Sequence, residues 1–242
     1  MSPEFIKAED LQKELRRLAD PVKARVLHGF FKTGPGEYGE GDLFLGVVIP
    51  VLRGLVKRTA GFSFSELSKL LASPFHEDRM MAVLIVAKQF QESDKNGRGK
   101  VYRFYLQNLD RINNWDLVDV SAPGVVGAYL LEQNKKIPSA LSKSKDLWRR
   151  RVAMISTFAF IRKGRFEETF RLAEALIQDE HDLMHKASGW MLREAGKRNP
   201  ERLKEFLEKF APRMPRTMLR YAIEKFPQAR RQRYLRMKRK DH

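Results

Sequence analysis

Two aspartates and a tryptophan stand close together in one apolar segment of the sequence. Asn113 and Asn114 come directly before Trp115, and asparagine favours the first position of a helix. Asp116 would then lie in the first turn, where a carboxylate offsets the positive end of the helix dipole. Asp119 lies one turn further along and would share a helix face with Trp115. Because a half-buried carboxylate is costly, we expect a cation or a function to hold Asp119 there.

One carboxylate beside aromatic and basic side chains suffices for a reaction that needs no general acid. Hydrolysis of the N-glycosidic bond to an N3- or N7-alkylated purine is such a reaction, because alkylation already makes the leaving base cationic. The carboxylate would stabilise the oxocarbenium-like sugar or position a water molecule. Tryptophan faces suit the sugar and the cationic base. Lysines and arginines would hold the phosphates in a manner that is independent of the base sequence.

Other chemistries lack their motifs in this sequence. Cysteine is absent, which excludes disulfides, thiol nucleophiles and thiolate metal sites. His181 and His185 are four residues apart but are not part of a His-Glu-x-x-His motif, so we assign them a structural or surface role. The glycine-rich stretch 34–41 lacks the Lys-Ser/Thr of a phosphate-binding loop and contains two glutamates. We therefore expect neither a metal nor a cofactor.

The charge balance indicates a polyanionic partner. The chain has 47 Lys and Arg residues against 30 Asp and Glu, a formal net charge of +17, and only seven of these cations lie in 230–240. Such an excess favours nucleic acid, with an anionic membrane surface as the second choice. The first residues do not resemble a signal peptide, and no apolar run approaches the roughly 18–20 residues that cross a bilayer. We expect a monomeric cytoplasmic protein that does not bind membranes.

The spacing of apolar residues predicts an all-α fold. Helical periodicity runs between polar or glycine-rich breaks at 33–41, 92–99 and 135–139, and only 43–52 could form a buried strand. A 35-residue period relates five small or apolar positions: Ala82, Leu117, Val152, Ala187 and Ala222. Two helices per period, without the tetratricopeptide signature, predict a HEAT-like solenoid. We expect one domain over 1–242, with N-terminal helices and a Gly-rich loop in 1–42, repeats in 43–228 and a basic segment in 229–242.

The same 35-residue register relates the residues that could do chemistry. Stacked repeats would gather on one basic, concave wall the following side chains: Trp115, Asp119, Arg151, Trp190, Lys186, Arg193 and Arg150. Other interpretations stay open at this point. A tryptophan on a helix is more often a packing residue, and Arg151 is either a solvated surface residue or the salt-bridge partner of Asp119.

Four segments resemble the AlkD-type DNA alkylation-repair glycosylases, a family with a HEAT-like fold. Residues 114–119 look like its Trp-Asp-x-Val-Asp segment, and 147–153 are similar to its arginine-bearing helix start. Residues 186–200 resemble its Lys-Ala-x-Gly-Trp-x-Leu-Arg-Glu block most closely, and 44–50 its Phe-Leu-Gly-x-x-x-Pro segment. Two positions depart from that pattern: Asn114 stands where some members have a second tryptophan, and Val48 where a polar DNA-contacting residue can occur.

The resemblance implies roles for individual residues. Asp119 would be the catalytic carboxylate, Trp115 and Trp190 would contact the sugar of the lesion nucleotide, and Arg151 would contact the DNA backbone. The substrate would be double-stranded DNA with alkylated bases, held without inserting the lesion into a base pocket. The alternatives are a non-catalytic DNA-structure binder of the same fold, in which Asp119 only pairs with Arg151, and a HEAT-like scaffold for an acidic protein. The presence of both tryptophans together with the aspartate favours the enzyme.

Overall fold

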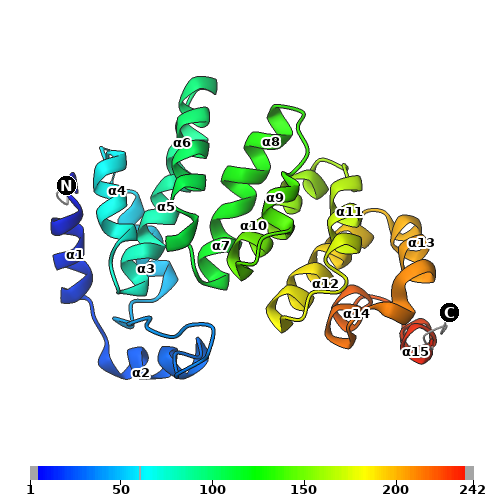
Figure 1. Cartoon of the computed structure of the whole chain (residues 1–242). Coiled ribbons are helices and arrows are strands. Elements are labelled where there is room, and N and C mark those ends of the chain that lie inside the picture. Colours follow the sequence, from blue (N-terminus) through cyan, green and yellow to red (C-terminus); the bar gives the residue numbers. More distant parts are fainter. Residues whose placement is uncertain (1–4, 60, 238–242) are drawn as a thin grey trace. The chain divides into compact units, whose positions relative to one another are not determined.

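The computed structural model describes residues 5–59 and 61–237, and its regular structure within these ranges is helical (Figure 1). The all-α prediction is therefore confirmed for the described residues. The chain divides into two compact units, Met1–Ser121 and Ala122–His242, and each is described by itself. No helix in the described ranges is long and apolar enough to cross a membrane.

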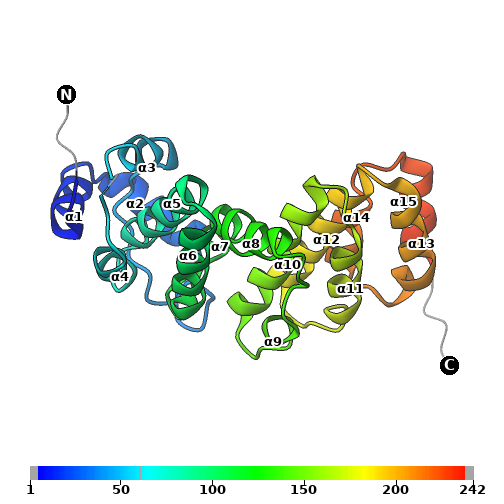
Figure 2. The ribbon, with the colours of Figure 1, turned by 90° about the horizontal axis from the view of Figure 1, so that it is seen from above.

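Unit 1 contains the helices that begin the chain. In order they are α1 (Ala8–Arg17), α2 (Pro21–Phe30), α3 (Ile49–Val56), α4 (Phe64–Leu71), α5 (His76–Glu92), α6 (Lys95–Gln107), the 3-10 turn η1 (Leu109–Arg111) and α7 (Trp115–Ala122), whose last residue begins the next unit. Helix α5 packs against α3, α4 and α6, and α1 packs against α4 and α5 (Figure 2). The buried stripe of α4, Leu67, Leu70 and Leu71, has the three- and four-residue spacing of one helix face.

Unit 2 contains the remaining helices. They are the π-helical turn η2 (Pro123–Gly127), α8 (Ala128–Glu132), α9 (Ser139–Ser142), α10 (Leu147–Arg162), α11 (Glu167–Ala175), α12 (Asp182–Gly196), α13 (Pro200–Phe210), the 3-10 turn η3 (Ala211–Arg213), α14 (Arg216–Ala222) and α15 (Gln228–Arg236). Helices α10, α12 and α14 pack side by side in chain order, and α11 and α13 pack against them as the second helices of successive pairs. A Cβ on Gly189 of α12 would lie 2.5 Å from the Met218 carbonyl oxygen, so glycine permits the close approach of α14.

Polar caps start helices where the sequence supplies them. Side-chain oxygens accept backbone N–H groups of the first turn at several helix starts, among them Asp20, Ser63, Asp94, Asp146 and Asn199. Each bond satisfies donors that have no partner inside the helix. The predicted break at 92–99 is present but shorter than predicted: α6 begins at Lys95, capped by Asp94, and only two residues separate it from α5.

The 35-residue register is confirmed as a packing register. Ala82, Leu117, Val152, Ala187 and Ala222 lie on α5, α7, α10, α12 and α14, and each is at most 1% exposed. The fold is therefore an all-α helical repeat, whereas the HEAT type and the single continuous domain stay predictions. The basic segment predicted at 229–242 falls largely within α15, and its residues 238–242 lie outside the described part of the chain.

The segment 43–52 is not a strand. Only Leu43 makes an isolated bridge, to Phe75, and α3 begins at Ile49 with a proline in its first turn. This segment is held by the buried Glu77 carboxylate, which accepts the backbone N–H groups of Leu45, Gly46 and Val47 at 2.9, 2.8 and 3.2 Å. These bonds occupy donors that a β-ladder would otherwise use.

Candidate functional site

Helix α7, which carries Trp115 and Asp119, begins at a buried asparagine. The Asn114 Oδ1 accepts the Trp115 N–H at 2.8 Å, and its backbone carbonyl accepts the Val118 N–H at 3.2 Å. Of the two predicted helix starts, Asn113 and Asn114, the second is thus confirmed. Asn114 is fully buried, and its Nδ2 donates to Asp42 Oδ2 at 3.1 Å. This side chain therefore fixes the start of α7 and presents no surface to a ligand.

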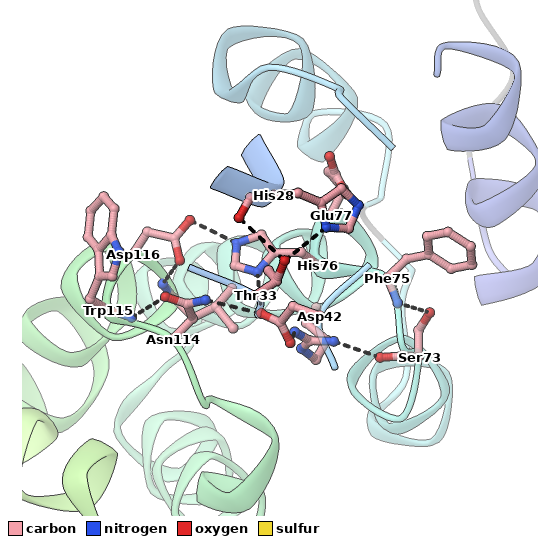
Figure 3. Close-up of polar contacts among 12 residues, drawn as sticks. His28, Thr33, Asp42, Ser73, Phe75, His76, Glu77, Asn114, Trp115 and Asp116 are labelled. Atoms are coloured by element: carbon pink, nitrogen blue, oxygen red, sulfur yellow. Dashed lines mark hydrogen bonds and ion pairs between the residues drawn. The ribbon is translucent and has the colours of Figure 1, made fainter. Parts of the chain in front are cut away.

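Asp116 has two roles at the same helix end (Figure 3). Its Oδ1 accepts the Leu117 N–H at 2.8 Å, as expected of a carboxylate in a first turn. Its Oδ2 lies 2.8 Å from His76 Nε2 at the start of α5. The sequence predicted the position of Asp116 in the first turn of the helix but not its contact with His76. Asp116 therefore anchors α7 to α5 within unit 1.

His76 lies between two carboxylates and is nearly inaccessible to solvent. Besides Asp116, its ring faces Asp42, with Nδ1 3.3 Å from Oδ2, and it stacks on Phe44 with ring centroids 4.7 Å apart. Burial and the Arg79 charge lower the pKa of His76, but the hydrogen bond and charge of Asp116 and the hydrogen bond of Asp42 outweigh them and raise the pKa to about 9. At neutral pH the ring is therefore protonated and donates from both nitrogens.

Asp42 is the common acceptor of this group. It receives Arg79 Nη2 at 2.5 Å on one oxygen, and His76 and Asn114 on the other. Burial raises the pKa of Asp42, but the His76 hydrogen bond, the Arg79 charge and the Asn114 hydrogen bond together hold it below its ordinary value. We call Asp42, His76, Arg79, Asn114 and Asp116 the His76 cluster. Its two cations balance its two carboxylates, which is the condition for burying such charges.

Trp115 is half-buried and rests on an aromatic stack. Its ring lies on Phe31 with centroids 5.2 Å apart and planes 17° apart, and Phe31 in turn stacks on Phe44 at 5.0 Å. Phe30 meets Trp115 edge-on at 5.9 Å. The interpretation of Trp115 as a packing residue is thus correct for part of the ring. The stack fixes the orientation of the indole and leaves the ring partly accessible.

Asp119 lies half-buried on α7, one turn after Trp115. Its negative charge acts on Tyr105, a buried residue whose hydroxyl lies 2.8 Å from Ser121 Oγ. Burial raises the pKa of Tyr105, the Ser121 hydrogen bond opposes the shift, and the Asp119 charge adds to it. Tyr105 therefore stays neutral and presents no competing charge to the carboxylate.

In unit 2, Arg151 is buried rather than solvated. It is 4% exposed, and its Nη1 donates to the Leu183 carbonyl oxygen in the first turn of α12 at 2.6 Å. The interpretation of Arg151 as a solvated surface residue is therefore wrong. Trp190 is half-buried on α12, and its ring centroid lies 6.0 Å from that of Phe158.

The other candidate cations of unit 2 differ in how fully they are engaged. Arg150 pairs with Asp179 through Nε at 2.6 Å and donates from Nη1 to the carbonyl oxygens of Ser144 and Lys145. Lys186 pairs with Asp182 on the same helix at 2.8 Å, with its side chain 42% exposed. Arg193 pairs with Glu224 and lies 3.4 Å from Glu194. Lys186 is thus the most accessible of these cations. Arg150 makes its ion pair and its hydrogen bonds with residues of unit 2.

The predicted site residues lie in two separate sets. Trp115 and Asp119 lie in unit 1, whereas unit 2 contains the others: Arg150, Arg151, Lys186, Trp190 and Arg193. The gathering of both sets on one concave wall stays a prediction. In the described ranges no group of three or more His, Asp or Glu side chains is arranged to hold a metal ion. His181 caps α12 by accepting the Leu183 N–H at 3.1 Å, which is a structural role.

Sequence reasoning missed the His76 cluster and the aromatic stack. The only trace in the sequence is the run from His76 to Arg79, four polar residues before an apolar helical segment. Such a run is typical of a solvated first turn, where acidic residues are favourable. The structure buries all four residues of this run. The sequence of such a polar run does not indicate which distant residues its side chains contact.

Comparisons with known proteins agree with this architecture. The family model described as "DNA alkylation repair enzyme" matches residues 11–226. A solved structure of a predicted DNA alkylation repair enzyme from Enterococcus faecalis superposes with a TM-score of 0.67 at 17% sequence identity, covering 87% of this chain and 97% of that one, which shows a shared fold. A comparison with curated protein sequences gives no significant match. Because the family match spans most of the chain, the protein belongs to the DNA alkylation repair enzyme family.

Proposed function

We propose that this protein is a DNA glycosylase that excises N3- and N7-alkylated purines from double-stranded DNA, acting as a monomer. DNA is the partner that the family implies. The observation that carries the proposal is the placement of Trp115 and Asp119 on a helix whose first turn is fixed by the His76 cluster. A preorganised carboxylate stabilises a developing positive charge better than one that must reorient during the reaction.

The two aspartates of α7 have different roles in this proposal, one structural and one reactive. Asp116 is committed to His76 and to the end of the helix, so a reactive role for it would disrupt the buried cluster. Asp119 lies one turn away and is half-buried, which strengthens its electrostatic effect relative to water. We therefore assign the reactive role to Asp119.

The proposed reaction needs no acid, because the base carries its own positive charge. The bond between C1′ and the base nitrogen breaks, and its electron pair leaves with the base and neutralises it. Asp119 stabilises the oxocarbenium ion, or it orients the water whose oxygen bonds to C1′ while its proton passes to the carboxylate and then to solvent. The partly exposed ring of Trp115 would lie against the deoxyribose of the lesion nucleotide.

Unit 2 would supply the second tryptophan and the backbone contacts. We assign a sugar contact to Trp190 and phosphate contacts to Arg151, Lys186 and Arg193, with Lys186 as the most exposed cation. Arg150 is less suited to bind DNA than Lys186, because its ion pair with Asp179 and its bonds to two carbonyl oxygens use most of its donors.

The experiment that tests the proposal is base release from a methylated duplex. The wild-type protein should release 7-methylguanine or 3-methyladenine, and Asp119→Asn should abolish release while circular dichroism and melting stay unchanged. Asp94→Asn is the matched control: it makes the same chemical change at an exposed helix cap, where asparagine caps equally well. Unchanged release in Asp119→Asn would refute the mechanism. DNA binding without release by the wild type would favour the non-catalytic alternative, and no salt-dependent DNA binding at all would favour the protein scaffold.

A further inference from the structure

Helix α2 carries an apolar stripe that is largely exposed to solvent. It has no buried residue, and Val22, Val26 and Phe30 are 63%, 67% and 61% exposed. Their four-residue spacing places them on one face of the helix. Single exposed apolar residues are normal on protein surfaces, but a continuous stripe marks a surface that binds something.

The same helix carries positive charge on its exposed surface. Lys23 and Arg25 are exposed between the apolar positions, and no acidic residue lies within α2. Asp20, the N-cap, pairs with Lys23 at 2.9 Å. We define Val22, Val26, Phe30, Lys23 and Arg25 as the α2 face. Its mixture of apolar and cationic groups suits a polyanion that also offers apolar surface.

The α2 face is continuous with the aromatic stack of the candidate site. Phe30, the last residue of the stripe, meets Trp115 edge-on at 5.9 Å, so the apolar surface runs from α2 to the indole. At the other end, the chain at Gly46 packs directly on the backbone of α2: a Cβ there would lie 2.2 Å from the Asp20 carbonyl oxygen. Both ends of α2 are therefore attached to unit 1, which holds the stripe in a fixed place beside Trp115.

We infer that the α2 face contacts the minor-groove edge of duplex DNA, next to the nucleotide held by Trp115. This inference rests on the proposed function for the position of that nucleotide. Apolar side chains that meet sugar edges or enter base steps are a common device of minor-groove binding, and they act best where the duplex is already distorted. Lys23 and Arg25 would contact the flanking phosphates.

An anionic membrane surface would also suit a basic amphipathic helix, but the geometry favours DNA. Membrane binding by such helices grows with buried apolar area, and three side chains on a ten-residue helix offer little of it. The stripe also ends at Trp115, whose partly exposed ring lies beside it. Membrane binding is therefore an outcome that the test must distinguish.

The test changes polarity and leaves shape unchanged. In Val22→Thr/Val26→Thr each threonine keeps the branched outline of valine, and both sites are exposed, so folding should be unaffected. Ile6→Thr is the control, because Ile6 is 64% exposed and precedes α1, away from the α2 face in sequence. Fluorescence anisotropy then measures affinity for a duplex with one abasic-site analogue and for the undamaged duplex, over a series of salt concentrations.

We expect the double threonine variant to bind the abasic duplex several-fold more weakly with the same salt slope, because an apolar contact releases no counterions. Lys23→Gln/Arg25→Gln should weaken binding to both duplexes and flatten the slope. Wild-type affinity in the threonine variant would overturn the inference. So would a second result: loss of binding to phosphatidylglycerol-containing vesicles in that variant with DNA affinity unchanged.

Failure of this inference and failure of the proposed function give different results. Binding to an abasic analogue requires no base release, so it is measured independently of catalysis. If the threonine variant loses affinity and the wild type releases no base, the α2 face contacts DNA but the proposed glycosylase activity is refuted. If the wild type releases the base and the variant keeps its affinity, the glycosylase activity is supported and the inference about the α2 face is overturned.

Discussion

His76 Nε2 lies 2.8 Å from Asp116 Oδ2, and this contact joins the first turn of α5 to the first turn of α7. The two residues are 40 positions apart in the sequence. The contact fixes the first turn of α7, which precedes Asp119, the carboxylate to which we assign the reactive role.

Replacing His76 should therefore destabilise unit 1. His76→Gln leaves the Asp42 and Asp116 carboxylates without their shared cation, and removing one partner of a buried pair costs about 3–5 kcal/mol. Urea denaturation should show this loss in the free energy of unfolding. The double variant His76→Gln/Asp116→Asn should regain part of it, because the second change removes a stranded charge. Strictly additive losses would contradict the pairing.

Because the pKa of His76 is raised, we predict that the free energy of unfolding falls as the pH becomes alkaline. The folded protein binds this proton up to a pKa of about 9, whereas the unfolded chain releases it near the ordinary value of 6.5. The stabilisation is therefore fully present below pH 6.5 and is lost as pH rises through about 9. Linkage makes this loss about 3 kcal/mol for a shift of that size. Urea denaturation at pH 6, 7.5 and 9.5 measures it, and His76→Gln should lack this loss.

The sequence predicts the repeating part of the fold well, because the repeat is a local pattern. Leu117 and Val152 are buried where the 35-residue register places them, since the same packing problem recurs in each helix pair. Asn114 is likewise predictable as a helix start, because capping depends on neighbours in sequence. The exposed positions of the 35-residue register do not pack between helices, so the register does not determine their residue types.

The partners of charged residues are not predictable in the same way. Asp42 and His76 are 34 residues apart, and Asp42 lies at the end of a glycine-rich loop whose composition says only that it turns. Arg151, in a run of three arginines, is buried against a carbonyl oxygen of α12. Long-range polar contacts depend on tertiary geometry, which a periodic pattern does not record. The sequence therefore predicted candidate site residues, which stay predictions, but not the buried contacts that support them.

Gly46 should be intolerant of substitution. Its φ of +85° lies in the left-handed region, and a Cβ there would lie 2.2 Å from the Asp20 carbonyl oxygen. Gly46→Ala should lower the free energy of unfolding by about 1–3 kcal/mol from backbone strain, with the clash adding to it. Gly54→Ala is the control, because nothing lies within 4 Å of its Cβ position in α3. That change should be neutral or stabilising, by up to about 1 kcal/mol. Equal effects at both glycines would contradict the geometry.

The basic C-terminal segment should be tested by charge rather than by deletion. Tyr234 is buried, and its hydroxyl donates to Glu208 Oε1 at 3.0 Å, so removing residues 229–242 would also remove packing. Arg231→Gln/Arg236→Gln changes two exposed cations of α15 and leaves Tyr234 in place. If this segment contacts DNA phosphates, the variant should bind every duplex more weakly, and its salt slope should flatten by up to about 0.9 for each lost contact. Anisotropy titrations over a salt series measure both quantities, and a slope equal to that of the wild type would show that α15 is a solvated helix without a DNA contact.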